Sequence, residues 1–251
     1  MFCHNPRTTG FCSCDRVLLR HFFHSQQPMG QYFYLVNVDK QQACGLGKLG
    51  EAIYDTLGLF HLLARVPSGG SIGPWAGHRL ITIGDYMKEC PTGMLTKAEE
   101  DEMNEWLSQQ KAEDTQSYYS FVAESYHGYR ARYIAAPEDK ILILRNLSKR
   151  VYVREQDFLR YQQDGGVLAE HIWEFDQLII INTAWSADPS CNMDPGFDII
   201  PGPWAGDRFD ITVLESIDPE SWQDVTKQEA EKMVKIVKSE HHEYGWRRGG
   251  E

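Results

Sequence analysis

The sequence predicts an α+β fold in which two related β-rich units are each followed by a capped helix and pack with pseudo-twofold symmetry. Three pairs of similar segments predict this architecture. They are "YFYLVNVDK" (32–40) with "ILILRNLSK" (141–149), "IGPWAGHRL" (72–80) with "PGPWAGDRF" (201–209), and "LTKAEEDEM" (95–103) with "VTKQEAEKM" (225–233). Because three markers recur in the same order, we interpret the chain as an internal duplication.

The first pair of segments predicts a strand that runs into a turn. β-branched and aromatic residues come first, and Asn37 and Asn146 then stand at matching positions, where an amide side chain favours a turn. The second unit continues with "RVYVRE", whose alternation predicts a hairpin partner strand. The first unit has the glycine-rich "QQACGLG" in that place. The apolar run "LIII" (178–181) is also typical of a buried strand.

Two helix starts are predicted at Thr96 and Thr226. Glu99 and Glu229 stand three residues further on, which completes the capping-box pattern in both segments. A further helix is predicted from about residue 114 to 129. In the last helix the expected inner face is Ala230, Met233, Val234 and Val237, with Lys232, Lys235 and Lys238 outside.

These elements divide the chain into four parts. Residues 1–28 lie outside the repeated segments and are expected to form a disordered appended tail, with Met29 as an alternative start. The parts that follow are the first unit (29–110), a helical linker (111–139) and the second unit with the C-terminal helix (140–251).

Bulk composition excludes some classes of function. The formal net charge is -11 and no Lys/Arg-rich stripe counters it, so nucleic-acid binding is not expected. The apolar runs are too short for a membrane span. The six cysteines are unevenly spaced, as in a reduced compartment, and the chain start lacks a secretory pattern, so we expect a cytoplasmic protein.

Neither a cofactor nor a metal is predicted. The segment "GLGKLG" (45–50) has the spacing of a dinucleotide-binding loop, but Arg65 stands where an acidic residue is required, which favours an ordinary flexible turn before a helix in "EAIYDTLGLF" (51–60). The Cys and His residues of the tail lack the paired spacing of zinc ligands.

The repeated Trp-Ala-Gly-x-Arg motif supplies the candidate site. Tryptophan and arginine dominate binding hot spots, although a buried Trp and an Arg paired structurally to carboxylates are the favoured explanation of the motif. The two copies differ at His78 and Asp207, which favours the second copy as the site, joined by the long loop 184–202. The candidate binding residues are Trp204, Asp207, Arg208, Trp75, Arg79, Trp185 and Asp188.

The segments "YFYLVNVDK", "GPWAGHRLITIGDY", "ILILRNLSKRVYVRE" and "GPWAGDRFDI" resemble a family of uncharacterised fungal proteins with repeated Tyr-Leu-Val-Asn and Trp-Ala-Gly-Asp-Arg motifs. The resemblance covers roughly residues 29 to 245. It implies an intracellular fungal protein with a role in accessory metabolism or interaction networks, and it transfers no catalytic residue.

The expected function is inferred from the catalytic motifs that the sequence lacks. The chain has no G-x-S-x-G, P-loop or H-E-x-x-H sequence. We therefore expect a module that binds a protein or a small molecule. The alternative is an enzyme with a cleft between the two units, in which Asp207 and Arg208 serve as acid-base and anion-binding groups.

Overall fold

The computed structural model describes residues 31–52, 57–65, 72–87, 89–110, 117–129, 132–186 and 201–243, and it is an α+β fold, as the sequence predicts. The predictions for the tail, for Met29, for Asp188 and for most of the loop 184–202 lie outside these residues. The strands are β1 (Tyr32–Asn37), β2 (Gln42–Lys48), β3 (His78–Gly84), β4 (Leu142–Asn146), β5 (Val151–Arg154), β6 (Ala184–Trp185), β7 (Arg208–Val213) and β8 (Gln223–Asp224). The helices are α1 (Leu49–Ala52), α2 (Leu59–Leu63), α3 (Lys97–Gln109), α4 (Tyr118–Ser125), α5 (Glu155–Asp164), α6 (Phe175–Thr183) and α7 (Thr226–Glu243).

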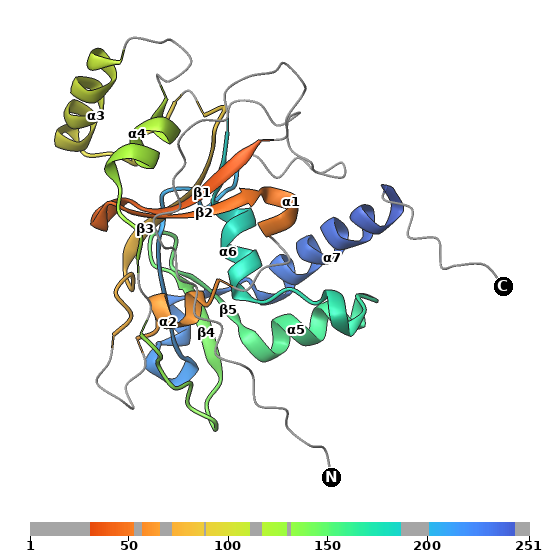
Figure 1. Ribbon diagram of the computed structural model, residues 1–251. Helices are drawn as coiled ribbons and strands as arrows, with labels where there is room; N and C mark the ends of the chain where they lie inside the picture. Colours follow the sequence, from red (N-terminus) through yellow and green to blue (C-terminus); the bar gives the residue numbers. More distant parts are fainter. Residues whose placement is uncertain are drawn as a thin grey trace.

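All the described strands belong to one mixed sheet, in the order β2-β1-β3-β7-β4-β5-β8, with β6 paired to β3 (Figure 1). The hairpins β1–β2 and β4–β5 form its two arms, and β3 and β7 meet antiparallel in the middle. The segment "VYVR" is the predicted hairpin partner strand. The two predicted units therefore share a single sheet.

Matching residues of the two units lie opposite each other where β3 and β7 meet. Arg79 pairs with Arg208, and each sits at the same place in its own copy of the motif. The Gly77 N–H donates to the Phe209 carbonyl (2.6 Å), and in the reciprocal contact the Gly206 N–H donates to the Leu80 carbonyl (2.8 Å). These reciprocal contacts are what a local twofold relation produces; descent of both units from one copied ancestor stays a prediction.

Each unit also adds a short extended segment to a strand of the other unit. Ala64 of the first unit bridges Ile211 of β7, and Ala184 of the second unit pairs with Thr82 of β3, both in parallel. Because the exchange runs in both directions, the two units interlock across the middle of the sheet. Neither half completes the sheet alone.

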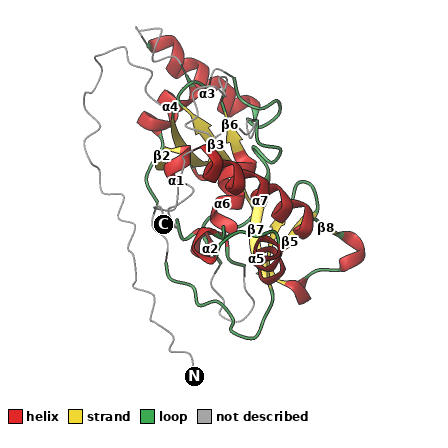
Figure 2. Ribbon diagram, turned by 90° about the vertical axis from the view of Figure 1, so that its right-hand side faces the viewer, coloured by secondary structure: helices red, strands yellow, loops and turns green. Residues whose placement is uncertain are grey.

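The helices that close the two units lie on opposite faces of the sheet (Figure 1). Helices α1, α2, α5, α6 and α7 cover the face that carries Leu80, whereas α3 and α4 cover the face that carries Ile81. The predicted pseudo-twofold packing therefore does not extend to α3 and α7. The two helices also differ in burial, because α3 buries no residue fully, whereas Ala230, Met233 and Val237 of α7 are core residues and α7 lies beside α5 (Figure 2).

Two predicted local structures are wrong. The run 178–181 lies in helix α6, which begins with a capping box between Glu174 and Gln177 and is buried along its whole length. A continuous apolar run fits a fully buried helix as well as a buried strand. Residues 42–48 form strand β2 and not a flexible turn, since pairing with β1 overrides the low strand propensity of glycine. The predicted helix 51–60 is described only in parts, as α1 and α2.

The capping prediction is correct for α3 and wrong for α7. Thr96 and Glu99 form the expected capping box. In α7 the Thr226 hydroxyl instead accepts the Arg154 N–H (2.9 Å), and the Glu229 carboxylate accepts the Asn182 side chain (2.9 Å). Lys232, expected outside, donates to the Asn182 side chain (2.7 Å) and is half-buried. The helix that was predicted within the linker corresponds to α4, in which Tyr118, Phe121 and Val122 are buried.

No helix in the described part of the chain is both long and apolar enough to cross a bilayer. Of the two cysteines within the described ranges, Cys44 is buried and Cys90 is half-buried.

Candidate functional site

A pocket of about 620 Å³ opens where the two repeated motifs meet. Its walls are the segments 91–94 and 205–208, together with Asp39, Arg79, Thr96 and Ser148. Three of the predicted site residues, Arg79, Asp207 and Arg208, are thus brought together at the middle of the sheet. They come from both units.

Glycines in the repeated motif position the two arginines. Gly77 and Gly206 have positive φ angles of 86° and 80°, which glycine adopts at little cost, and each directs the chain from the Trp-Ala turn into β3 or β7. Gly73 and Gly202 lie directly against the backbone of Leu62 and Asn182, so that a Cβ would collide there. The two motifs therefore share a backbone conformation, in which a glycine with a positive φ stands two residues before each arginine.

Arg79 is saturated by acceptors from its own unit. Its Nε and Nη2 donate to Asp39 Oδ1 (2.8 and 2.5 Å), and its Nη1 and Nη2 also reach Glu99 Oε2 and Oε1 (3.1 and 2.7 Å). Nη1 donates further to the Met94 carbonyl (2.5 Å). Burial by itself raises the pKa of both carboxyls, but the opposing interactions together outweigh it: the pKa of Asp39 is lowered by Arg79 and Arg208, and the pKa of Glu99 by Arg79 and Thr96. Arg79 is a structural cation.

Asp39 also joins the two units. Its Oδ2 accepts the backbone N–H of Arg79 (2.8 Å) and the Nη1 of Arg208 (2.8 Å). Like charges directly opposite on neighbouring strands repel each other. One carboxylate that bonds both guanidinium groups offsets this repulsion.

Arg208 keeps an unused donor face. Its Nη1 donates to Asp39 and to the Gly77 carbonyl (2.9 Å), whereas no described residue accepts a hydrogen bond from its Nε or Nη2. Its side chain is 44% exposed, compared with 13% for Arg79. Nε and Nη2 form the edge of a guanidinium that binds a carboxylate or phosphate with two parallel hydrogen bonds.

Asp207 is held in place by neighbours of its own unit. Its Oδ2 accepts the Asn146 side chain (2.8 Å) and lies 3.3 Å from Lys149 Nζ. At the matching place in the first unit, the Asn37 side chain bonds His78 Nδ1 (3.1 Å), and burial lowers the pKa of that imidazole. The difference between His78 and Asp207 is therefore accommodated within two similar local networks.

The predicted tryptophans lie away from the pocket. Trp75 and Trp204 are buried in the main core, and their backbone N–H groups make matching bonds to the carbonyls of Leu62 (2.8 Å) and Asn182 (2.7 Å). Trp185 is half-buried and donates from its indole to the Glu89 carbonyl (2.7 Å). The structural alternative for Trp75 and Trp204 is thus the better description.

Sequence analysis did not identify Asp39, Glu99 and Ser148 as part of the site. A signal for two of them was present, because Asp39 and Ser148 occupy the same place in the first pair of repeated segments, "NVDK" and "NLSK". The first unit has an acidic residue at this repeated position and the second unit has a neutral one, so the two units differ in charge there. The pairing of Glu99 with Arg79 needs the three-dimensional fold.

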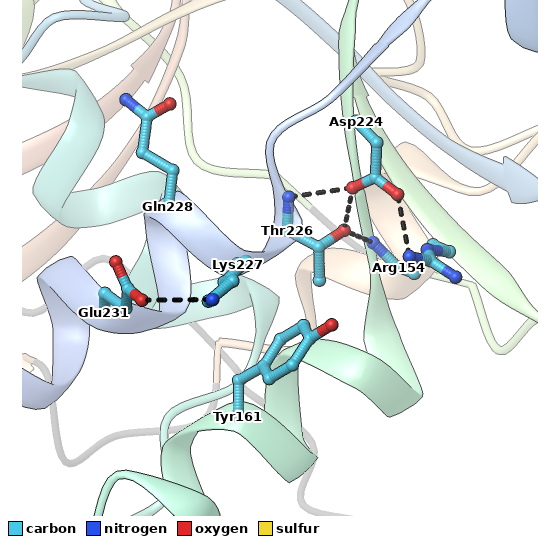
Figure 3. Close-up of a pocket in the computed structure, with 7 residues that line it drawn as sticks. All are labelled: Arg154, Tyr161, Asp224, Thr226, Lys227, Gln228 and Glu231. Carbon is cyan, nitrogen blue, oxygen red and sulfur yellow. Dashed lines mark hydrogen bonds and ion pairs between the residues drawn. The ribbon is translucent and has the colours of Figure 1, made fainter.

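A second pocket, of about 470 Å³, lies between α5 and the start of α7 (Figure 3). Its charged groups face one another, since Arg154 pairs with Asp224 (2.8 Å) and Lys227 lies 3.9 Å from Glu231. Tyr161 forms its floor in the view of Figure 3. This pocket therefore offers no free charge comparable to that of Arg208.

Within the ranges that the structure covers, no group of three or more His, Cys, Asp or Glu side chains is placed to hold a metal ion. Comparisons with models of protein families, with curated proteins and with solved structures find no match to this chain.

Proposed function

We propose that the protein is a small-ligand-binding module and that its site is the pocket between the two repeated motifs. The single observation that carries this proposal is the unused donor face of Arg208 beside a pocket of about 620 Å³. Ligand pockets combine a concave surface with a few fixed polar groups. Here Asp39 and the Gly77 carbonyl hold Nη1 of Arg208, which fixes its guanidinium before a ligand arrives.

The geometry supports binding better than catalysis. The enzyme hypothesis gave Asp207 an acid-base role. In the structure, however, the Asn146 side chain donates to Oδ2 of this carboxylate, and Lys149 Nζ lies 3.3 Å from the same oxygen. A group tied in this way is suited to fixing the turn before β7. The same pocket supports a small ligand better than a protein partner, because its polar groups converge in a hollow.

The experiment is native mass spectrometry of protein purified from the cells that produce it, followed by equilibrium dialysis of ligand-free protein against a metabolite extract of those cells. We expect a small molecule to be retained. Thr92→Trp, which places a large ring on the exposed rim of the pocket, should abolish retention.

Ser108→Trp is the matched control, because it adds the same side chain at an exposed position of α3 outside the pocket. It should retain the molecule as the wild type does. Retention that survives Thr92→Trp, or recovery of a protein partner with no small molecule, would contradict the proposal.

A further inference from the structure

Arg79 and Arg208 occupy the same position of the repeated motif but differ in what fills their donor edges. The Nε and Nη2 of Arg79 are bonded to the Asp39 carboxylate (2.8 and 2.5 Å). No described residue accepts a hydrogen bond from Nε or Nη2 of Arg208. The first unit thus contains an internal arginine–carboxylate pair at the place where the second unit has an arginine whose Nε–Nη2 edge meets no carboxylate of the described residues.

The residues that match Asp39 and Glu99 explain the difference. Ser148 matches Asp39 in sequence, and its hydroxyl accepts the backbone N–H of Arg208 (3.0 Å), as Asp39 accepts the backbone N–H of Arg79 (2.8 Å). The serine side chain is too short and uncharged, so it supplies nothing to the guanidinium. Glu229, which matches Glu99, is buried beneath the other face of the sheet and bonds Asn182.

From this we infer that the ligand carries a carboxylate, which binds edge-on to Nε and Nη2 of Arg208 and takes the place that the Asp39 carboxylate takes at Arg79. The inference rests on the proposed function, since it assigns the ligand class of the same pocket. At Arg79 one oxygen of the Asp39 carboxylate accepts from both Nε and Nη2, and the matching edge of Arg208 offers the same two charge-assisted donors to a ligand carboxylate. The exposed Thr92 and Ser148 hydroxyls at the rim can hydrogen-bond the remainder of the molecule.

The charged side chains around the pocket balance one another, with three positive groups (Arg79, Arg208 and Lys149) and three negative groups (Asp39, Glu99 and Asp207). Arg79 is neutralised by Asp39 and Glu99, and Lys149 lies beside Asp207. Arg208 shares Asp39 with Arg79 and has no carboxylate of its own. A carboxylate is therefore selected by the Nε–Nη2 donor edge of Arg208, which no described residue fills, and not by an excess of positive charge.

The test is a titration of ¹⁵N-labelled full-length protein with malonate at constant ionic strength, with chloride as the balancing anion. The Nε–H resonance of Arg208, assigned by its loss in Arg208→Lys, should shift and saturate. A parallel titration with inorganic phosphate separates carboxylate recognition from a general preference for anions. We expect malonate to bind about tenfold more tightly than phosphate, which corresponds to one well-formed hydrogen bond.

The decisive variant is Ser148→Asp, which supplies the second unit with the carboxylate of the first. Its side chain should occupy the donor edge of Arg208 and weaken malonate binding by about tenfold or more, the loss expected when an acceptor pair is already filled. Ser108→Asp adds the same charge at an exposed position on α3 and should leave binding unchanged. Ser148→Asp that binds malonate like the wild type would overturn the inference.

The outcomes separate the inference from the proposed function. If malonate gives no saturable shift while the metabolite extract still supplies a retained molecule that Thr92→Trp excludes, the pocket binds ligands and the carboxylate assignment is wrong. If phosphate binds as tightly as malonate, the assignment to carboxylates is also wrong. If neither malonate nor an extracted molecule binds, both proposals fail.

Discussion

The two motifs at the centre of the sheet share a backbone and differ in the acids around their arginines. Gly77 and Gly206 have similar φ angles, and Trp75 and Trp204 make matching backbone bonds. Around that frame, Arg79 is enclosed by two carboxylates, whereas Arg208 shares one of them and faces a pocket. One repeated turn thus holds a fully paired arginine in one half and, in the other, an arginine with a donor edge that no described residue fills.

The variants with the largest expected effect test whether the backbones of the two repeated motifs are packed equally closely. Gly73→Ala and Gly202→Ala each place a Cβ against backbone atoms, of Leu62–Leu63 and of Asn182 with Ala184. Backbone cannot yield as a side-chain tip does, so each variant should lower the free energy of unfolding by about 3 kcal/mol. Urea denaturation followed by circular dichroism measures it.

Gly93→Ala is the control for this pair. Gly93 has a φ of 78°, but an added Cβ would meet nothing within 4 Å. The cost should be only the backbone strain of about 1 kcal/mol. A Gly73 variant as stable as the Gly93 variant, with Gly202→Ala strongly destabilised, would show that the two motifs are not equivalent in packing.

The sequence was sufficient for the elements that local chemistry fixes. The hairpin β4–β5 follows from the alternation of its second strand, and the capping box of α3 follows from Thr96 with Glu99. Helix α6 could not be distinguished from a strand, because its apolar run is buried on every side. Strand β2 was missed because its glycines form a strand only through pairing with β1.

The site was predicted only in part, for a related reason. The repeated motif identified Arg79, Asp207 and Arg208, which line the pocket. It also selected Trp75 and Trp204, since a residue required by the core recurs as regularly as one required by a ligand. Whether a repeated arginine is paired or free depends on side chains distant in sequence, such as Glu99 in α3, and no local pattern reveals this.

The next effect concerns α2 and α6, which lead into the two motifs and begin differently. Helix α6 has its own capping box, whereas the first N–H groups of α2, at Gly58 and Leu59, donate to Asp176 of α6 (2.9 and 3.2 Å). Burial raises the pKa of Asp176 to about 6, against the opposing effect of these N–H donors. The folded protein therefore binds a proton that the unfolded chain releases near pH 4.

A carboxyl whose folded pKa is raised stabilises the protein less as the pH rises from its unfolded to its folded value. Asp176→Asn cannot titrate. We expect the stability of the wild type relative to this variant to fall by roughly 2–3 kcal/mol between pH 4 and pH 7. Urea denaturation across that range measures the difference, and a constant difference would show that Asp176 is ionised throughout.

The variant with the smallest expected effect gives the first unit a residue of the second unit. Asp39→Ser gives the first unit the residue of the second and leaves two arginines opposite each other without their shared carboxylate. Because the Asp39 and Arg79 side chains retain 18% and 13% exposure, we expect a loss of about 2 kcal/mol, below the cost of breaking a fully buried pair. Ser148→Ala, which removes only an exposed acceptor, should cost less than about 1 kcal/mol.

The pH dependence of this difference distinguishes charge from packing. The pKa of Asp39 is lowered in the folded protein from its ordinary value of 3.8, because its interactions with Arg79 and Arg208 together outweigh burial. A depressed folded pKa gives stability that is present above the unfolded value and is lost as the pH falls through the folded one. The gap between wild type and Asp39→Ser should therefore narrow below about pH 4. A gap that stays constant down to pH 2 would mean that Asp39 acts through packing, and the contrast between the two arginines would then not be electrostatic.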